Sequence, residues 1–308
     1  MRSHAASVNS PRPATRSIIR QALGEMDAAG IDFSLLSLTS PGVQGVVDPR
    51  QAVTRARVAN DQLAEVVAAH PTRFGAFAAL PLQDPAAAAA ELERCVTQLG
   101  FHGALVNGYS NVGDADTGWY YDHERFLPFW ERVEALGVPV YLHPRDPLAG
   151  NRGIYEGHPE LFGAVWTFTV ETSTHALRLM TSGLFDRFPG LTVILGHLGE
   201  TLPFNIWRIS HRAAFMGDLI TFEKPLSSYL HDNFYVTTSG NFHTQTLNAT
   251  LAEIGVDRVL YSSDYPYESM REASDWFDNA AISDSDRRRI GCTNARRLFP
   301  GLPERIGP

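Results

Sequence analysis

Ionisable side chains recur at the ends of apolar segments in this sequence. His143 closes the run VPVYLH, His197 closes LTVILGH with Glu200 three residues later, and Asp264 follows RVLYSS. Imidazoles and carboxylates bind divalent metal ions in proteins, and both groups also transfer protons. The pattern therefore favours metal-assisted or acid–base chemistry, provided that the fold brings these side chains together.

Each of these residues also has an ordinary structural explanation. A lone histidine near a strand end more often packs and forms a hydrogen bond than it binds a metal ion. Asp264 before Tyr-Pro suits a turn, and Glu200 suits the first turn of a following helix, where the helix dipole favours an acid. Three such residues at three strand ends make a shared site the better explanation.

The segments that carry these residues are typical of buried strands. Most are apolar throughout, as expected of strands that are covered on both faces in a parallel sheet. Seven strands are predicted, over residues 31–38, 75–80, 103–107, 138–143, 191–197, 234–239 and 258–264.

Amphipathic stretches separate the strands and predict helices. They cover residues 17–30, 51–70, 84–100, 126–136, 171–188, 202–215, 244–254, 270–280, 284–290 and 293–299. Repeated strand–helix units predict one α/β domain with a parallel sheet, either doubly wound or a barrel. Seven units over about 280 residues favour the (β/α)₈ barrel, whose sites lie at the carboxyl ends of the strands.

The start of the chain does not supply the eighth strand of such a barrel. Residues 1–16 are polar with two prolines and are expected to form a tail, and residues 17–308 a single barrel domain. The missing unit is the first strand, because residues 17–30 are expected to form the helix before the first visible strand.

Composition and charge exclude several classes of protein. Of the 308 residues, 44% are hydrophobic and 19% charged, which excludes a largely disordered chain. The formal charge of −8 argues against non-specific binding to nucleic acid or to an anionic membrane. No apolar run reaches the length of a membrane span or forms a secretory signal. Cys95 and Cys292 are expected to be reduced thiols of a cytoplasmic protein.

Four motifs together resemble the metal-dependent aromatic-acid decarboxylases of the amidohydrolase superfamily. They are LHPR, GHLGE, TTSGNF and SSDYPYE, and the similarity extends from about Met26 to Phe299. The nearest likeness is to γ-resorcylate (2,6-dihydroxybenzoate) decarboxylases, with 2,3-dihydroxybenzoate decarboxylases next. The resemblance implies a (β/α)₈ barrel with one divalent ion, Mn²⁺ or Zn²⁺ with Mg²⁺ as a further candidate, and no organic cofactor.

The resemblance also implies roles for individual residues. His143 and Asp264 would bind the metal, and Asp264 would also protonate the aromatic ring. His197 and Glu200 would form an acid–base pair. The substrate, a small aromatic carboxylic acid, would be contacted by Arg208, Asn107 and Tyr267.

One departure from the family pattern concerns the first strand. The family carries Glu-x-His or His-x-His there, both residues being metal ligands, whereas this sequence has only His4 in a segment that is not strand-like. The favoured explanation is that a longer natural protein has lost its start, and the alternative is a variant with weakened metal binding.

The expected reaction is reversible decarboxylation of a hydroxylated benzoate to the phenol and CO₂. The alternatives are a metal-dependent hydrolase or hydratase on the same barrel, and an inactive or truncated paralogue. The aromatic segments 265–277 and 166–180 predict a homodimer or homotetramer. No nucleic-acid or membrane partner is expected.

Overall fold

Seven parallel strands form the centre of the molecule in the computed structural model, which describes residues 13–303. Their spatial order follows the chain: β1 (Ser34–Leu36), β2 (Phe74–Ala76), β3 (Ala104–Asn107), β6 (Val140–His143), β7 (Val193–Leu195), β8 (Phe234–Thr237) and β9 (Val259–Leu260). A parallel bridge between Ala78 and Ala104 joins the β1–β2 pair to the other five strands. Within residues 13–303 no eighth strand pairs with the free edges of β1 and β9.

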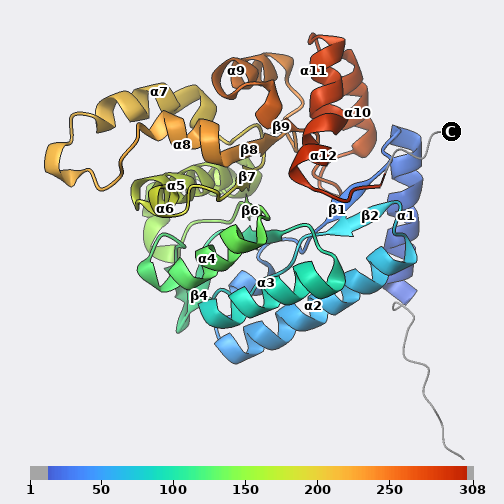
Figure 1. The fold of residues 1–308 in the computed structure, drawn as a ribbon, viewed down its shortest axis with the longest axis horizontal. Helices are drawn as coiled ribbons and strands as arrows, with labels where there is room; N and C mark the ends of the chain where they lie inside the picture. Colours follow the sequence, from blue (N-terminus) through green and yellow to red (C-terminus); the bar gives the residue numbers. More distant parts are fainter. Residues whose placement is uncertain (1–12, 304–308) are drawn as a thin grey trace, which may run out of the picture.

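Helices surround these strands (Figure 1). They are α1 (Pro13–Ala29), α2 (Pro49–Ala69), α3 (Pro85–Leu99), α4 (Leu127–Leu136), α5 (Thr167–Thr181), α6 (Leu184–Arg187), α7 (Leu202–Ala213), α8 (Leu226–Asn233), α9 (Thr244–Ile254), α10 (Met270–Asn279), α11 (Asp284–Arg288) and α12 (Asn294–Leu298). Two of them begin at an Asp-Pro pair, where Asp48 accepts a hydrogen bond from the Gln51 amide (2.8 Å) and Asp84 from the Ala87 amide (3.1 Å). Both pairs cap otherwise unpaired amides and place proline where it is tolerated.

The strands divide the apolar side chains into two layers, since successive side chains point to opposite faces. On β6, Val140 and Leu142 pack outward against the helices, whereas Tyr141 packs inward. The buried residues of the inward layer are Phe77, Leu105, Ile194, Tyr235, Leu260 and Phe299. Phe299 lies beyond the last helix, with its ring centroid 5.7 Å from that of Phe77, so the C-terminal segment fills the barrel interior.

The seven predicted strands are all present, although shorter than expected, but several other expectations were wrong. The predicted helix 171–188 is two helices, because Gly183 adopts a left-handed conformation (φ 75°) between α5 and α6. Residues 13–16, assigned to the tail, begin α1, whose first residue is Pro13; residues 1–12, including His4, lie outside the described part. An antiparallel hairpin, β4 (Ser110–Val112) and β5 (Asp114–Trp119), separates β3 from the next helix. Helix α8 was also not expected.

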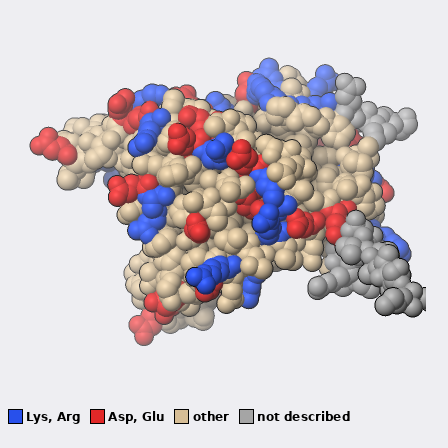
Figure 2. Space-filling view, turned by 60° about the horizontal axis from the view of Figure 1, so that its bottom comes forward, with Lys and Arg blue, Asp and Glu red and all other residues tan. Residues whose placement is uncertain are grey.

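The surface bears intermixed charges. Figure 2 shows lysine and arginine side chains beside aspartate and glutamate over one face. The connection between α7 and α8 projects from the body (Figure 1). In the described part of the chain, none of the helices combines the length and apolar character needed to cross a bilayer.

Candidate active site

Neighbouring strands place polar side chains at their carboxyl ends. His143 ends β6 and lies opposite Asn107, the last residue of β3. His143 Nδ1 lies 3.0 Å from the Pro144 carbonyl oxygen, a contact in which the nitrogen donates and Nε2 keeps its lone pair. Burial and the neighbouring His197 lower the pKa of His143, which favours its neutral form.

A strained turn follows β7 and carries the second histidine. His197, Leu198, Gly199 and Glu200 have consecutive φ values of 53°, 58°, 82° and 59°. Such left-handed conformations cost free energy in non-glycine residues and cluster at functional sites. Gly199 is required for space as well, since a Cβ there would lie 2.9 Å from Pro203. Glu200 therefore precedes α7 in this turn and is not a first-turn residue of the helix.

The turn places His197 between two carboxylates. Its Nδ1 lies 2.7 Å from Glu200 Oε1, and its Nε2 lies 3.7 Å from Asp264 Oδ2. The Glu200 side chain is only 2% exposed, so that contact is shielded from water. Burial alone would lower the pKa of His197, but hydrogen bonding to Asp264 and Glu200 outweighs it and raises the pKa to about 10.

Asp264 enters the site from the segment after β9. Its own φ is 67°, again in the left-handed region. A Cβ at Gly240 would lie 3.1 Å from His197 Cδ2 and 3.4 Å from Asp264 Oδ2. Gly240, itself at φ 61°, thus leaves the space in which the imidazole and the carboxylate meet.

The donor atoms suit a divalent metal ion in part. Within residues 13–303 no group of three or more His, Cys, Asp or Glu side chains is arranged to hold a metal. His143 and Asp264 nevertheless supply a neutral imidazole and a carboxylate, which suit Mn²⁺ or Zn²⁺. The Nδ1 contact to Pro144 is the kind of hydrogen bond that orients a metal-binding histidine. These two residues therefore fit one part of a ligand set.

The three predicted substrate contacts lie in different places. Asn107 is 1% exposed and donates to the Leu38 carbonyl (3.2 Å), while its Oδ1 is buried without a hydrogen-bond partner. Tyr267 is exposed, and its hydroxyl lies 2.6 Å from Thr39 Oγ1. Arg208 lies on α7, where it lines a groove of about 360 Å³ together with Thr201.

Sequence reasoning missed three hydroxyl groups below the strained turn, those of Tyr141, Thr237 and Ser239. The Ser239 hydroxyl accepts a hydrogen bond from the His197 backbone amide (3.2 Å) and lies 2.8 Å from Thr237 Oγ1. The signal was present, because Tyr141 shares the inward face of β6 with His143 and Thr237 shares that of β8 with Tyr235.

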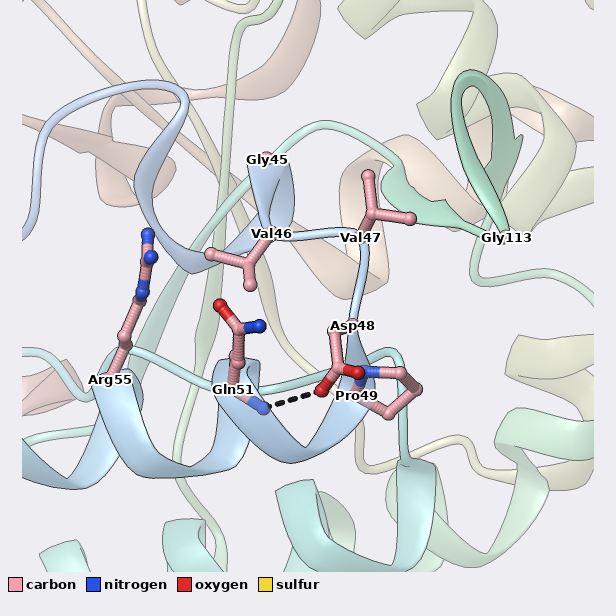
Figure 3. Close-up of a pocket in the computed structure, with 8 residues that line it drawn as sticks. All are labelled: Gly45, Val46, Val47, Asp48, Pro49, Gln51, Arg55 and Gly113. Atoms are coloured by element: carbon pink, nitrogen blue, oxygen red, sulfur yellow. Dashed lines mark hydrogen bonds between the residues drawn. The ribbon is translucent and has the colours of Figure 1, made fainter.

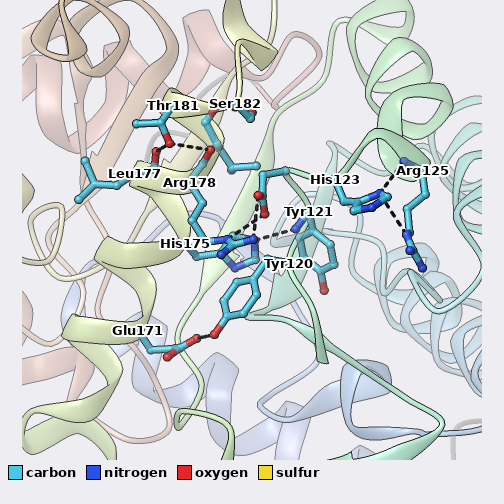
Figure 4. Close-up of polar contacts among 12 residues, drawn as sticks. Tyr120, Tyr121, His123, Arg125, Glu171, His175, Leu177, Arg178, Thr181 and Ser182 are labelled. Atoms are coloured by element: carbon cyan, nitrogen blue, oxygen red, sulfur yellow. Dashed lines mark hydrogen bonds and ion pairs between the residues drawn. The ribbon is translucent and has the colours of Figure 1, made fainter. Parts of the chain in front are cut away.

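A second buried polar cluster lies beside α5 (Figure 4). The Tyr120 hydroxyl donates to Glu171, and the Tyr121 amide donates to His175 Nε2 (3.1 Å). Burial raises the pKa of Glu171, whereas burial, assisted by Arg178, lowers the pKa of His175 to about 3. His175 Nδ1 is buried without a hydrogen-bond partner. A neutral histidine is therefore part of the core here.

Another hollow, shown in Figure 3, is lined by none of the candidate site residues described above. It has a volume of about 530 Å³ and is lined at the start of α2 and the hairpin tip by Asp48, Gln51, Arg55 and Gly113, among others. None of the predicted site residues lines it. Among the residues that line this hollow, the polar groups are those at the start of α2 and the exposed Arg55 side chain. The residues at the strand ends therefore remain the candidate site.

Comparison with known proteins gives consistent results. A family model described as amidohydrolase matches residues 12–301. A γ-resorcylate decarboxylase of Rhizobium sp. is 55% identical over 276 residues, which cover 89% of this chain and 84% of the relative. A crystal structure of a 2,6-dihydroxybenzoate decarboxylase complexed with 2,6-dihydroxybenzoate superposes with a TM-score of 0.88 at 55% identity, covering 90% of this chain and 86% of the other. A dihydroxybenzoic acid decarboxylase from Polaromonas sp., with bound manganese and the inhibitor 2-nitroresorcinol, gives a TM-score of 0.88 at 52% identity, with 91% and 85% covered.

Proposed function

The chain belongs to the amidohydrolase family, in its branch of metal-dependent aromatic-acid decarboxylases, and we propose on this premise that it converts a hydroxylated benzoate of the γ-resorcylate type into a phenol and CO₂. The reaction is a non-oxidative carbon–carbon lyase reaction and is reversible. The structural observation behind the assignment is the run of contacts from Glu200 through His197 to Asp264, beside His143.

Asp264 is the proposed acid. Its proton forms a C–H bond at the ring carbon that bears the carboxylate. The C–C bond then breaks, its electron pair returns to the ring, and CO₂ leaves. His197 lies between Glu200 and Asp264, so it is placed to pass a proton back to Asp264. One proton is consumed per turnover.

A divalent ion, Mn²⁺ or Zn²⁺ with Mg²⁺ as a further candidate, would be held by His143 and Asp264. When bound, it would act as a Lewis acid toward the oxygen atoms of the substrate. His143 is oriented for this by the Pro144 carbonyl, and its lowered pKa keeps the imidazole neutral. We assign Asn107, Tyr267 and Arg208 to substrate binding, with the unpartnered Asn107 Oδ1 as the best-supported contact.

The assay uses 2,6-dihydroxybenzoate, 2,3-dihydroxybenzoate and other ortho-hydroxybenzoates with each metal, measuring phenol and CO₂. We expect chelation to abolish product formation and Mn²⁺ to restore it. Asp264→Asn tests the role of the acid. If its metal content equals that of the parent chain, a loss of activity is assigned to proton transfer and not to loss of the metal. Hydrolysis of an ester or amide without CO₂ release would instead indicate the hydrolase alternative. A chain that retains no metal and yields no phenol would indicate an inactive relative.

We also propose a homodimer, with a homotetramer as a further assembly, formed through α7 and the segment after it. Most of the aromatic side chains in segments 166–180 and 265–277 are at least partly buried, whereas Phe204, Trp207, Phe215, Met216 and Leu219 are 53% to 87% exposed. Together they expose roughly 700 Å² of apolar surface, close to the ~800 Å² that one partner buries in a standard interface. Sedimentation tests this proposal by comparing Trp207→Asp with Ile154→Asp, a control at another exposed apolar residue. Only Trp207→Asp should weaken the dimer. A monomeric parent chain at micromolar concentration would contradict the proposal.

The cytoplasm is the proposed compartment. Both Cys95 and Cys292 are free thiols, as expected in a reducing environment. Fractionation of cells that express the chain from its own gene is the direct test.

A further inference from the structure

Three hydroxyl groups form a compact network on the inward faces of β6 and β8 and the residues that follow. The Tyr141 hydroxyl lies 3.0 Å from Thr237 Oγ1 and 3.5 Å from Ser239 Oγ. Thr237 and Ser239 are themselves 2.8 Å apart, and both residues are buried. Each hydroxyl can both donate and accept, so the three groups can satisfy one another.

The network contacts the site through a backbone amide. Ser239 Oγ accepts the His197 N–H (3.2 Å), and the Thr237 carbonyl accepts the Leu198 N–H (2.7 Å). These are the first two residues of the left-handed turn that carries His197 and Glu200. Two successive hydrogen bonds, donated by the turn amides to acceptors on β8 and just after it, thus hold a backbone conformation that non-glycine residues rarely adopt.

Gly196 shows how closely the network is packed under the turn. A Cβ at this residue would lie 3.0 Å from the Tyr141 hydroxyl and 3.2 Å from Ser239 Oγ. The hydroxyl groups therefore occupy the space that a side chain at residue 196 would need, and they lie directly beside the backbone that leads into His197.

We propose that Tyr141, Thr237 and Ser239 are positioning residues of the reaction, which hold the His197–Glu200 turn in its left-handed conformation. The inference rests on the proposed function for its catalytic consequence, whereas its structural part is independent of the substrate. Because the imidazole must lie between Glu200 and Asp264, a small shift of the His197 backbone would lengthen one of the two contacts.

Substitutions at Thr237 and Ser239 separate hydroxyl loss from volume loss. Thr237→Val keeps the shape and removes the hydroxyl, Thr237→Ser keeps the hydroxyl, and Ser239→Ala removes the acceptor of the His197 amide. Ser274→Ala is the matched control, because it breaks the comparable contact between Ser274 Oγ and the Tyr261 hydroxyl (2.8 Å) away from the turn.

Two measurements follow, namely steady-state kinetics of the metal-loaded enzyme and amide hydrogen exchange over residues 196–201. In Ser239→Ala and Thr237→Val we expect kcat to fall about 10-fold with KM changed less than twofold, since a net hydrogen bond corresponds to a factor of that size. Exchange of the turn amides should rise about 10-fold in the same variants. Thr237→Ser and Ser274→Ala should match the parent chain in both.

Unchanged exchange in Ser239→Ala overturns the positioning role, whatever happens to kcat. Faster exchange with unchanged kcat also overturns it, because the turn would then be held without consequence for the reaction. An equal fall in kcat and an equal rise in exchange in Ser274→Ala overturn the positioning role as well, because losing any buried hydroxyl contact would then have the same effect. If the parent chain decarboxylates no hydroxybenzoate, the proposed function fails, and the exchange data alone still decide whether the hydroxyl groups hold the turn.

Discussion

Replacing His175 by glutamine should make the protein more resistant to acid. The buried imidazole has a pKa of about 3 in the folded chain, against 6.5 for an ordinary histidine. Below pH 6.5 the unfolded chain therefore binds a proton that the folded chain does not, and the free energy of unfolding falls as the pH falls toward 3. Above pH 6.5 this residue contributes no pH dependence.

The magnitude follows from the separation of the two pKa values. Each pH unit between them corresponds to about 1.4 kcal/mol, so His175 should lower the free energy of unfolding by about 2 kcal/mol at pH 5 relative to pH 7. Glutamine cannot titrate, and its side-chain oxygen can still accept the Tyr121 amide hydrogen. It loses the ring contacts with Tyr120 and Tyr121, whose centroids both lie 4.9 Å from that of His175, so we expect a cost of about 1 to 2 kcal/mol at pH 8.

The assay is urea unfolding of the parent chain and His175→Gln at pH 8, 7, 6 and 5, at one protein concentration. The difference in the free energy of unfolding between the parent chain and His175→Gln should shrink below pH 6.5 and reach zero or reverse near pH 5. Glu171, Arg178, Tyr120 and Tyr121 face or adjoin this histidine and stay the same in both proteins, so the difference isolates one titration. His158→Gln, at an exposed histidine, is the control. Parallel pH curves for parent and His175→Gln would refute the reasoning.

Three further outcomes are expected. Asp264→Asn should keep the far-ultraviolet circular dichroism of the parent and lower kcat by ~10²–10⁴, the usual cost of losing a general acid; activity within tenfold of the parent would remove Asp264 from the proton transfer. Gly240→Ala should lower the free energy of unfolding by about 1–2 kcal/mol in urea and reduce kcat, because its methyl group would meet His197 at 3.1 Å from a left-handed backbone, and a fully active, equally stable variant would contradict this. Asn60→Ala should cost about 2–4 kcal/mol by the same measurement, because the buried amide both donates to and accepts from the Ala79 backbone; a loss under 1 kcal/mol would show that water replaces it.

The strands were predictable from sequence because burial on both faces makes each one an apolar run. The hairpin β4–β5 was not, since Asp114 and its neighbours are exposed and carry no apolar alternation. His143, His197 and Asp264 could be singled out as candidates because each lies at the end of a predicted strand. The hydroxyl groups under the turn were missed, because residues such as Ser239 have many ordinary explanations in a sequence.

Local patterns also did not reveal backbone handedness. Glu200 three residues after His197 suits the start of a helix as well as it suits a strained turn. The turn is accompanied by tertiary hydrogen bonds that the His197 and Leu198 amides donate to Ser239 and Thr237, which a local pattern cannot reveal. The place of Arg208 was equally hidden, since helical periodicity fixes the face of α7 but not the partner of that face. Roles inside the site depend on such long-range contacts.

The position of Phe299 has a consequence for the order of events during protein synthesis. Every other buried residue of the inward layer precedes it in the chain, so the ribosome releases them before the residue that completes their packing. Until then, the Phe77 ring and its neighbours lack the packing contact that the Phe299 ring provides. Strand pairing can start while the chain is still being made, but the barrel interior reaches its final density only after Phe299 has been added. A stalled nascent chain that ends before α12 would therefore present apolar surface to chaperones.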